Sequence, residues 1–246
     1  MSVDHLAVIK QSNSILAGLS EGDWMRWRHF LTPVELEIHH VIHESGRPEK
    51  YIYLPATCII SVQYDFEDGF SAEFAEIGNE GMTGTFIFTG NSSTVSHSTV
   101  ISKGLAYKAD CRFVEHEFNH SSAFRRQILR YMQLLMLYTA QTAVCNRRHS
   151  ITQQLARVLL VNQDRVAGND LVFTHELIAR SLGVRREGVS QAAKYLQERG
   201  DINYSRGNIF VKNRQGLLDS ACECYRIVKN ETDRLSYSDQ HLCGSL

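Results

Sequence analysis

Residues 173–211, FTHELIARSLGVRREGVSQAAKYLQERGDINYSRGNIFV, constrain the fold of this chain more than any other segment. Thr174 can cap a helix that runs to Leu182, and Gly183 can adopt the positive φ of a tight turn before a second helix begins at about Arg185. This spacing predicts a helix-turn-helix. The contacts between the two helices would come from Ile178, Ala179, Leu182, Val184, Val189 and Ala192.

Two short strands are expected directly after the second helix. The segments INYS and NIFV flank a turn at residues 205–208, and this arrangement is typical of the wing of a winged helix. Residues 174–214 carry 8 Lys+Arg against 4 Asp+Glu, which favours a negatively charged partner. The alternative is an ordinary helical hairpin.

Polar side chains on the exposed side of the second helix suit the recognition of double-stranded DNA. Arg186 can pair bidentately with guanine, Glu187 can accept a hydrogen bond from cytosine, and Gln191 can pair with adenine, so we predict that these three read bases. The alternative for each side chain is a charged surface that only faces water. The predicted contacts to the DNA backbone, which set position rather than sequence, are Arg185, Ser190, Lys194, Arg206 and Thr174.

Charge is unevenly distributed along the chain. The net charge is -1, yet residues 1–120 carry 8 Lys+Arg against 16 Asp+Glu, whereas residues 121–246 carry 18 against 11. An acidic first half and a basic second half indicate two tasks on one chain, and nucleic acid is the expected partner of the second half.

Signals for export or membrane insertion are not found in the sequence. No apolar run approaches the roughly eighteen residues of a membrane span, and MSVDHLAVIK lacks a basic segment followed by an apolar one. We therefore expect a cytoplasmic protein with no membrane contact and with reduced cysteines. Cys222 and Cys224 form a C-x-C pair, which is a weak signal, so we expect inert thiols and no metal site.

Short apolar runs separated by turn residues dominate the first half. Residues 13–31 are expected to form one or two helices anchored by Trp24 and Trp27. The following runs, ELEIHHVIH, YIYL, CIISVQY, SAEFAEI, GTFIFTG and TVISKGLAYKA, are expected to be strands, and the first of them would place Leu36 and His40 on one face. This pattern predicts a small antiparallel barrel or sandwich.

The pattern then changes to a helical period from about residue 123 to residue 148, without Pro or Gly. One apolar seam recurs at alternating steps of three and four, and a second stripe contains Leu129, Met132 and Met136. We predict that this helix pairs two subunits; the alternative is that both stripes are buried within one subunit. The seam assigned to the dimer interface consists of Ile128, Tyr131, Leu135, Tyr138, Thr142 and Cys145.

Over residues 13–225, the chain resembles the Crp/Fnr family of bacterial transcription regulators. The resemblance is carried by THELIARSLGVRREGVSQAAKYL, by INYSRGNIFV, by CNRRHSITQQLARVLL and by EIGNEGMTG. It implies an α+β fold: an antiparallel β-roll like that of cyclic-nucleotide-binding domains (residues 1–120), a dimerisation helix (121–149) and a winged helix-turn-helix (150–246). It also implies a homodimer on a palindromic operator, with RNA polymerase as a further partner.

The family's Arg-Glu pair at the start of the recognition helix matches Arg186 and Glu187. Many members carry another Arg four positions later, where this chain has Gln191, so the resemblance does not fix the half-site.

The roll departs from the cyclic-nucleotide binders of this family, which hold the phosphate with an arginine. No arginine occurs between Pro48 and Cys111, and the corresponding stretch, STVSHSTVIS, offers neutral side chains. We predict that no cyclic nucleotide binds and that no cofactor is needed. The cysteine cluster of the iron–sulfur members is also absent, because no cysteine precedes Cys58.

A haem-responsive or metal-responsive version of the same regulator is the alternative. It would draw its ligands from His39, His40 and His43, which lie close together in sequence, or from His97 and Cys111. Three neighbouring histidines are also typical of a polar strand surface.

The stretch HEFNH, residues 116–120, matches the H-E-x-x-H pattern of zinc hydrolases. No carboxylate follows from Phe118 to Gln163 to act as a third ligand, and the charged residues that follow first are Arg125, Arg126 and Arg130. We therefore predict no catalytic residues and interpret HEFNH as a joint in which Phe118 packs on the roll while His116, Glu117 and His120 cap or solvate the connection. A sensor module without DNA binding is a third alternative.

Overall fold

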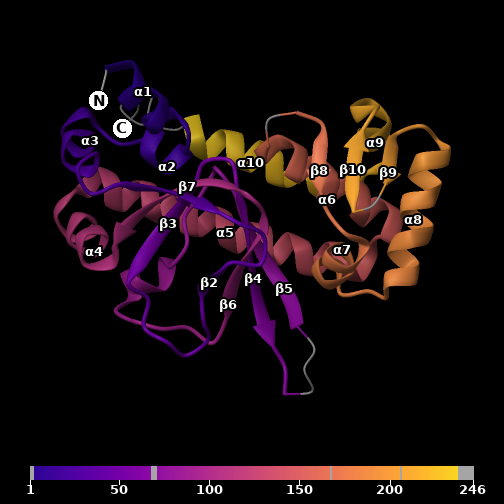
Figure 1. Cartoon of the computed structure of the whole chain (residues 1–246), viewed down its shortest axis with the longest axis horizontal. Coiled ribbons are helices and arrows are strands. Elements are labelled where there is room, and N and C mark those ends of the chain that lie inside the picture. The colour runs from indigo at the N-terminus through magenta and orange to yellow at the C-terminus, as the bar shows by residue number, and fades with distance from the viewer. Residues whose placement is uncertain (1–2, 68–70, 167, 206, 238–246) are drawn as a thin grey trace, which may run out of the picture.

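The computed structural model of the chain describes residues 3–67, 71–166, 168–205 and 207–237. Two halves, joined by one long helix, make up an α+β fold (Figure 1). The N-terminal half, indigo to magenta in Figure 1, contains two sheets, whereas the C-terminal half, orange to yellow, is mostly helical with one small sheet. The predicted fold class is confirmed. None of the helices in the described ranges is both long and apolar enough to cross a membrane.

Two antiparallel sheets form the roll of the N-terminal half. One has the strand order β1-β7-β3 and the other β2-β6-β4-β5, so strands far apart in sequence are hydrogen-bonded neighbours. Leu36, Ile60 and Val100 are buried together between the sheets. The strands are β1 Thr32–Leu36, β2 Val41–His43, β3 Tyr51–Pro55, β4 Ile59–Asp65, β5 Ser71–Ile77, β6 His97–Ser102 and β7 Gly104–Asp110.

Three segments of the roll differ from the expected strands, and one of them, TVISKGLAYKA, is divided between β6 and β7, which belong to different sheets. ELEIHHVIH is not one strand, because His39 has a φ of 70° and the chain turns there between β1 and β2; Leu36 is buried while His40 is exposed. GTFIFTG forms a 3-10 helix, η1 (Thr85–Thr89), between Gly84 and Gly90, whose φ values are 70° and 81°. Glycine adopts this left-handed backbone without a steric penalty, so the chain bends at both ends and no extended segment remains.

Four helices cover one end of the roll (Figure 1). Trp24 and Trp27 are buried as predicted, and Trp27 packs against Phe113 and Phe124 with ring centroids 5.2 and 4.9 Å apart. The contact joins the N-terminal helices to the segment that follows the roll. The helices are α1 Val3–Gln11, α2 Ser14–Ala17, α3 Glu21–Trp27 and α4 Cys111–His120.

Helix α5, Ser122–Arg148, runs from the N-terminal half to the C-terminal half, close to its predicted limits (Figure 1). The seam predicted to form the dimer interface requires correction, because its side chains pack within the chain itself. Leu135 is partly buried, and the other five members, Ile128, Tyr131, Tyr138, Thr142 and Cys145, are at most 9% exposed.

Both stripes of α5 share the helical period, so periodicity could not tell which one faces the subunit's own core. The large apolar residues that α5 leaves exposed are Leu129, Met136 and Val144.

The C-terminal half is built around α6, whose first turn has a capping box formed by Ser150 and Gln153. Side chains of α6 pack beneath the helices and the sheet that follow, and α10 lies along α5 and α6. Its elements are α6 Ile151–Arg165, β8 Asp170–Val172, α7 His175–Leu182, α8 Arg186–Glu198, β9 Ile202–Ser205, β10 Asn208–Val211, α9 Arg214–Ser220 and α10 Cys224–Tyr237.

A buried ion-pair network joins the two halves. Arg165, at the end of α6, donates hydrogen bonds from Nη1 to Glu76 Oε2 at 2.7 Å and from Nη2 to Glu80 Oε1 at 2.7 Å. Asn162 donates to the same Glu76 oxygen at 3.1 Å. Burial by itself lowers the pKa of Arg165, but the surrounding negative charges, first that of Glu80, outweigh burial and raise it. The guanidinium therefore stays charged and fixes α6 to the end of β5 and the turn after it.

Candidate nucleic-acid interface

Helices α7 and α8 form the predicted helix-turn-helix. Thr174 is the N-cap of α7, and its Oγ1 accepts a hydrogen bond from the backbone N–H of Leu177 at 3.2 Å. Gly183 ends α7 with a φ of 62°, and the N–H of Val184 donates to the carbonyl of Ala179 at 3.0 Å. These bonds satisfy backbone groups at both ends of α7 and set the direction in which α8 begins.

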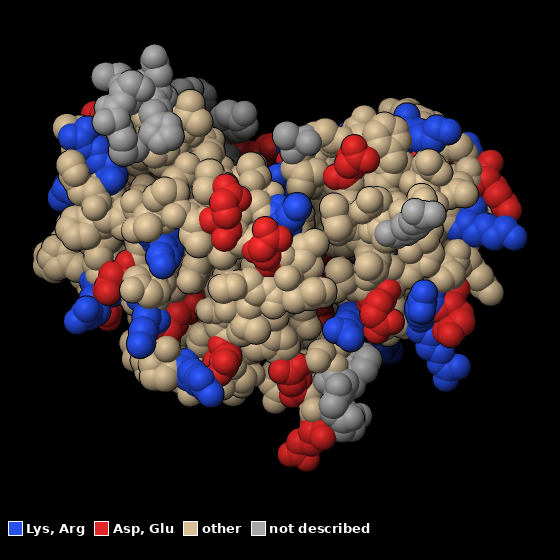
Figure 2. Space-filling model, viewed as in Figure 1, with Lys and Arg blue, Asp and Glu red and all other residues tan. Residues whose placement is uncertain are grey.

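The N-terminal turns of α8 present one buried and one exposed face. Val189 is fully buried beneath the helix, whereas the five longest polar side chains of this region are exposed. Basic and acidic side chains alternate along the edge of the molecule where α8 lies (Figures 1 and 2). The exposed face matches the predicted base-reading set and two of the predicted phosphate contacts: Arg185, Arg186, Glu187, Gln191 and Lys194.

Ser190 has partners inside the protein. Its Oγ donates a hydrogen bond to the backbone carbonyl of Arg186 at 3.0 Å and lies 3.0 Å from Nδ1 of His175 on α7. His175 also stacks on Tyr204 of the wing, with ring centroids 3.9 Å apart. Ser190 and His175 thus connect α7, α8 and the wing. Thr174 likewise accepts a cap hydrogen bond through its Oγ1, so the two small residues predicted to contact phosphates also hold the helix-turn-helix together; their contact with phosphates stays a prediction.

His175 was missed from the sequence, because a polar residue after a helix cap gives no sign that its ring is buried. Burial lowers the pKa of His175, and the positive charge of Arg186 lowers it further. The ring is therefore held in its neutral form, which adds no second cation behind the exposed face of α8.

Strands β9 and β10 form the predicted wing, and β8 adds a third strand to the same sheet. Tyr204 and Ile209 are register partners in this sheet, and Ile209 is buried in the core of the C-terminal half. Arg206, the predicted backbone contact at the wing tip, lies outside the described residues.

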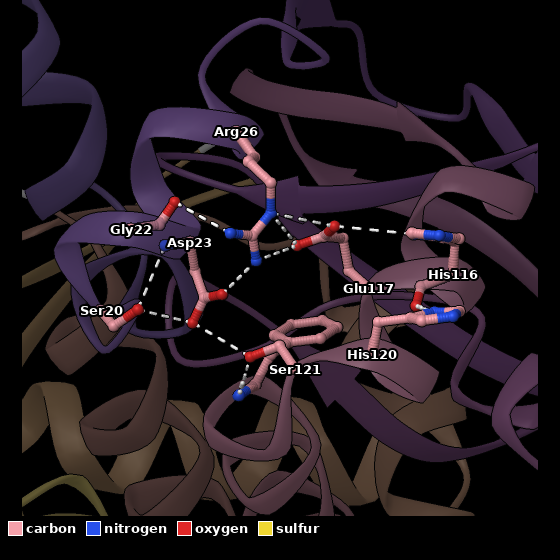
Figure 3. A network of polar contacts seen from close by, with 9 residues as sticks. Ser20, Gly22, Asp23, Arg26, His116, Glu117, His120 and Ser121 are labelled. Atoms are coloured by element: carbon pink, nitrogen blue, oxygen red, sulfur yellow. Dashed lines mark hydrogen bonds and ion pairs between the residues drawn. The ribbon is translucent and has the colours of Figure 1, made fainter.

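HEFNH lies at the C-terminal end of α4 (Figure 3). The Glu117 side chain is 4% exposed, and its carboxylate accepts hydrogen bonds from Arg26, with Nη2 at 2.9 Å. Arg26 also binds Asp23, and Asp23 accepts hydrogen bonds from Ser20 at 2.7 Å and Ser121 at 3.1 Å. The expectation that Glu117 caps or solvates the connection is therefore corrected: it is buried and ion-paired, because α3 brings a guanidinium from 91 positions away.

The other residues of HEFNH behave as predicted. His116 and His120 are exposed and stack on each other, with ring centroids 4.0 Å apart. Phe118 stacks on Phe88 of η1 at 4.5 Å. In the described part of the chain, HEFNH contributes to no group of three potential metal ligands. The arrangement is a joint between α3, α4 and α5 and gives the hydrolase alternative no support.

The stretch that would hold a phosphate in a cyclic-nucleotide binder carries no cation here. Ser96 and Ser98 are buried, and Nδ1 of His97 lies 2.6 Å from Oδ2 of Asp65. Glu49 lies close to Gly84, and burial raises the pKa of its carboxyl to about 8. An anionic ligand bound here would have to displace these interactions and lose its own bound water, and no arginine side chain would be present to form hydrogen bonds with it instead.

The histidines considered as haem or metal ligands do not converge. His39 and His40 are exposed, whereas His43 is buried, with Nδ1 3.9 Å from Glu49 Oε2. The turn at His39 separates them, so they do not form a ligand set among the described residues.

Residues 153–220 match the family model of the Crp-like helix-turn-helix domain. The matched region begins in α6 and ends with α9, so it contains the α7–α8 pair and the wing. Residues 153–220 therefore form a helix-turn-helix domain of this type.

Three solved structures each resemble between 78% and 87% of the chain. FixK2 from Bradyrhizobium japonicum has a TM-score of 0.65 at 16% identity, over 78% of this chain and 98% of that chain. A putative transcriptional regulator of the Crp/Fnr family from Eubacterium rectale has a TM-score of 0.64 at 15% identity, over 87% of this chain and 99% of that chain. A CooA mutant from Carboxydothermus hydrogenoformans has a TM-score of 0.60 at 15% identity, over 85% of this chain and 95% of that chain.

At these identities the likeness shows the fold, and that fold is the one expected from the resemblance. No curated protein sequence matches the chain.

Proposed function

We propose that this protein is a homodimeric, sequence-specific DNA-binding regulator of transcription, because it has the fold of Crp/Fnr regulators and contains a Crp-like helix-turn-helix domain. The exposed polar face of α8, inside the matched domain, is the observation that carries this proposal. Such a regulator would bind the bacterial chromosome, which lies in the cytoplasm, and this agrees with the cytoplasmic location expected from the sequence. RNA polymerase remains the expected further partner.

The proposed dimer uses the stripe of α5 that the subunit leaves open. Leu129, Met136 and Val144 are more than half exposed and lie on one side of the helix. Gln133, Ala140 and Ala143 occupy further exposed positions. Positions 129, 133, 136, 140 and 143 therefore advance by alternating steps of four and three residues, with Val144 beside the last. This is the seam that two α-helices share in a coiled coil, and a second copy of α5 is the partner that fits it.

A dimer of this kind would place two copies of α8 on the two halves of a palindromic operator. Their spacing would be about one helical turn of DNA, so that both helices enter the major groove on the same side of the duplex.

Replacing Arg186 with alanine is expected to relax the choice of base rather than to abolish binding. The guanidinium is exposed at the first position of α8 and can form two hydrogen bonds with guanine, worth about 1–3 kcal/mol of discrimination. Selection of bound duplexes from a random pool gives the operator, and mobility shifts on operator variants then measure the discrimination for both proteins.

Lys194→Ala is the matched control for Arg186→Ala. It also removes an exposed cation from α8, but from a predicted phosphate contact two turns further on. Its affinity should fall evenly for all duplexes, with a salt dependence lower by about one counterion. Unchanged base preference in Arg186→Ala would contradict the assignment of Arg186 as a reader. Failure of the wild-type protein to select any sequence would contradict the proposed function.

We further propose that the effector, if one is required, is not a cyclic nucleotide. The buried Glu49 beside Gly84 and the absence of a cation at Ser96–His97–Ser98 support this. Calorimetric titration with cAMP and with cGMP is expected to give no heat of binding up to about 1 mM ligand. This result would mean that the binding free energy is no more favourable than about −4 kcal/mol. A dissociation constant in the micromolar range for either nucleotide would refute this part of the proposal.

A further inference from the structure

Three cysteines and one histidine meet behind the winged helix, at the end of α5. Cys145 lies on the last turn of α5 and His149 is the C-cap residue of the same helix. Cys222 lies between α9 and α10, and Cys224 is the first residue of α10. All four ligand atoms lie within 4.8 Å of one another, and the three cysteines are buried. We propose that these four residues bind one zinc ion that fastens the end of α5 to the beginning of α10.

The distances between the ligand atoms suit a single tetrahedral ion. Zn–S bonds of about 2.3 Å and Zn–N bonds of about 2.0 Å separate two sulfurs by about 3.8 Å and a sulfur from a nitrogen by about 3.5 Å. The Sγ atoms of Cys145 and Cys222 are 3.5 Å apart, and Cys224 Sγ is 3.5 Å from His149 Nδ1. Polynuclear iron–sulfur clusters hold their thiolates on different metal atoms and need a wider set of ligands.

The surroundings of His149 and Cys224 match those of metal ligands. Nε2 of His149 lies 3.3 Å from Glu223 Oε2, so a proton on Nε2 leaves Nδ1 with the lone pair that faces the sulfur. Carboxylates paired in this way with a ligating imidazole fix its tautomer and its ring orientation. Gln141 donates a hydrogen bond to Cys224 Sγ at 2.9 Å, which stabilises negative charge on that sulfur.

A buried cation stands close to this group. Arg157 is 2% exposed, and its Nη1 donates to Thr142 Oγ1 at 3.3 Å, one turn before Cys145 on α5. Its Cζ lies 6.0 Å from the ring centroid of Tyr138, but no carboxylate of the described residues forms an ion pair with it, and a buried charge without an ionic partner is costly. Three thiolates, one neutral imidazole and Zn²⁺ carry a net charge of −1, so the metal site would compensate Arg157.

The donor set favours zinc over other ions. Thiolates are soft ligands that exclude magnesium and calcium, and three thiolates with one imidazole are a common set for structural zinc in a closed site. Structural rather than catalytic zinc also fits the position, because four protein ligands leave no site open for water. The chain reverses between α5 and α6 within the same region, so the ion would fix the direction in which the winged helix leaves the dimer helix.

Metal analysis of the full-length protein, purified under reducing conditions, tests the proposal. Inductively coupled plasma mass spectrometry should find about one zinc per chain in the wild type and less than about a tenth of that in Cys222→Ser and in His149→Ala. Cys111→Ser, which removes a cysteine on α4 outside the cluster, should keep the wild-type content. Cobalt added to metal-free protein should give the visible bands of a tetrahedral thiolate site, and these should vanish in Cys222→Ser.

Glu223→Gln separates a metal site from a merely structural thiol cluster. It keeps the size of the side chain but removes the charge that orients His149, so the affinity for zinc measured against a competing chelator should fall about 10–100-fold. Reduced protein that binds no zinc at micromolar concentrations would overturn the proposal, as would zinc content unchanged in Cys222→Ser. Iron or copper in place of zinc, at one per chain, would overturn the choice of metal. A Cys145–Cys222 disulfide in freshly lysed cells, detected by mass spectrometry after alkylation, would replace the metal site with a redox pair.

Discussion

Replacing Met136 with glutamate is expected to convert the proposed dimer into monomers and to weaken operator binding by at least about 100-fold, because linked binding to two half-sites gains a factor of that order. Met136 is 68% exposed on the open stripe of α5. In a parallel or antiparallel pair of α5 helices, the two new carboxylates would be buried in the seam and would lose their hydration. Sedimentation velocity and mobility shifts at matched protein concentrations measure the two effects.

Val95→Glu is the control for Met136→Glu. Val95 is also 68% exposed, but it lies on the roll two residues before β6, so its replacement adds the same charge without touching α5. Circular dichroism should show both variants folded, since neither side chain is part of a core. A Met136→Glu protein that still sediments as a dimer would contradict the proposed interface while leaving the helix-turn-helix proposal intact.

Replacing Arg165 with methionine is expected to destabilise the chain by about 3–5 kcal/mol, the usual result of removing one partner from a buried ion pair. Arg165 is 7% exposed at its side chain and contacts both Glu76 and Glu80. Methionine fills a similar volume but leaves two carboxylates without their cation, and Glu76 is itself buried. Because these contacts join α6 to β5, the orientation of the winged helix on the roll should become variable as well. Chemical denaturation and limited proteolysis between the halves measure the two effects.

The pH dependence of this destabilisation provides an internal check. The penalty arises from negative charge left without compensation, so protonation of the carboxylates removes it. The difference in unfolding free energy between Arg165→Met and the wild type should therefore shrink as the pH falls from about 8 to about 5. Arg226→Met removes an exposed arginine from α10 and should show neither the loss nor the pH dependence. A loss that stays constant with pH would indicate a packing defect instead of an uncompensated charge.

The C-terminal half was predictable because its signals are local. A cap at Thr174, a glycine at the turn and an apolar residue beneath α8 specify the helix-turn-helix within about fifteen positions, and each requirement is visible in neighbouring residues. The long helix was equally visible, since an uninterrupted run of helix-forming residues needs no tertiary contact to be recognised.

The burial of α5 could not be predicted in the same way. Its two stripes have the same period, and which one faces the core depends on where the roll and α10 pack. The packing buries Tyr138 and Cys145 and leaves Met136 open, which is the opposite of the predicted interface. The prediction of a strand at GTFIFTG was wrong for a related reason. The apolar alternation of this segment suits a strand, but the positive φ values at Gly84 and Gly90 bend the chain, so the segment cannot pair with a neighbouring strand.

The sequence by itself determined the winged helix, the long helix and the sandwich-like first half. It also determined that no arginine lies in the stretch where the related cyclic-nucleotide binders hold the phosphate. Each of these features depends only on residues that are neighbours in the sequence. Tertiary structure decided which residues meet across long separations. It joined Glu117 to Arg26, Arg165 to Glu76 and Glu80, and Cys145 and His149 to a C-x-C pair that in sequence had suggested inert thiols. Such contacts depend on how the halves pack against each other, and that packing cannot be predicted from the periodicity of the side chains along the sequence.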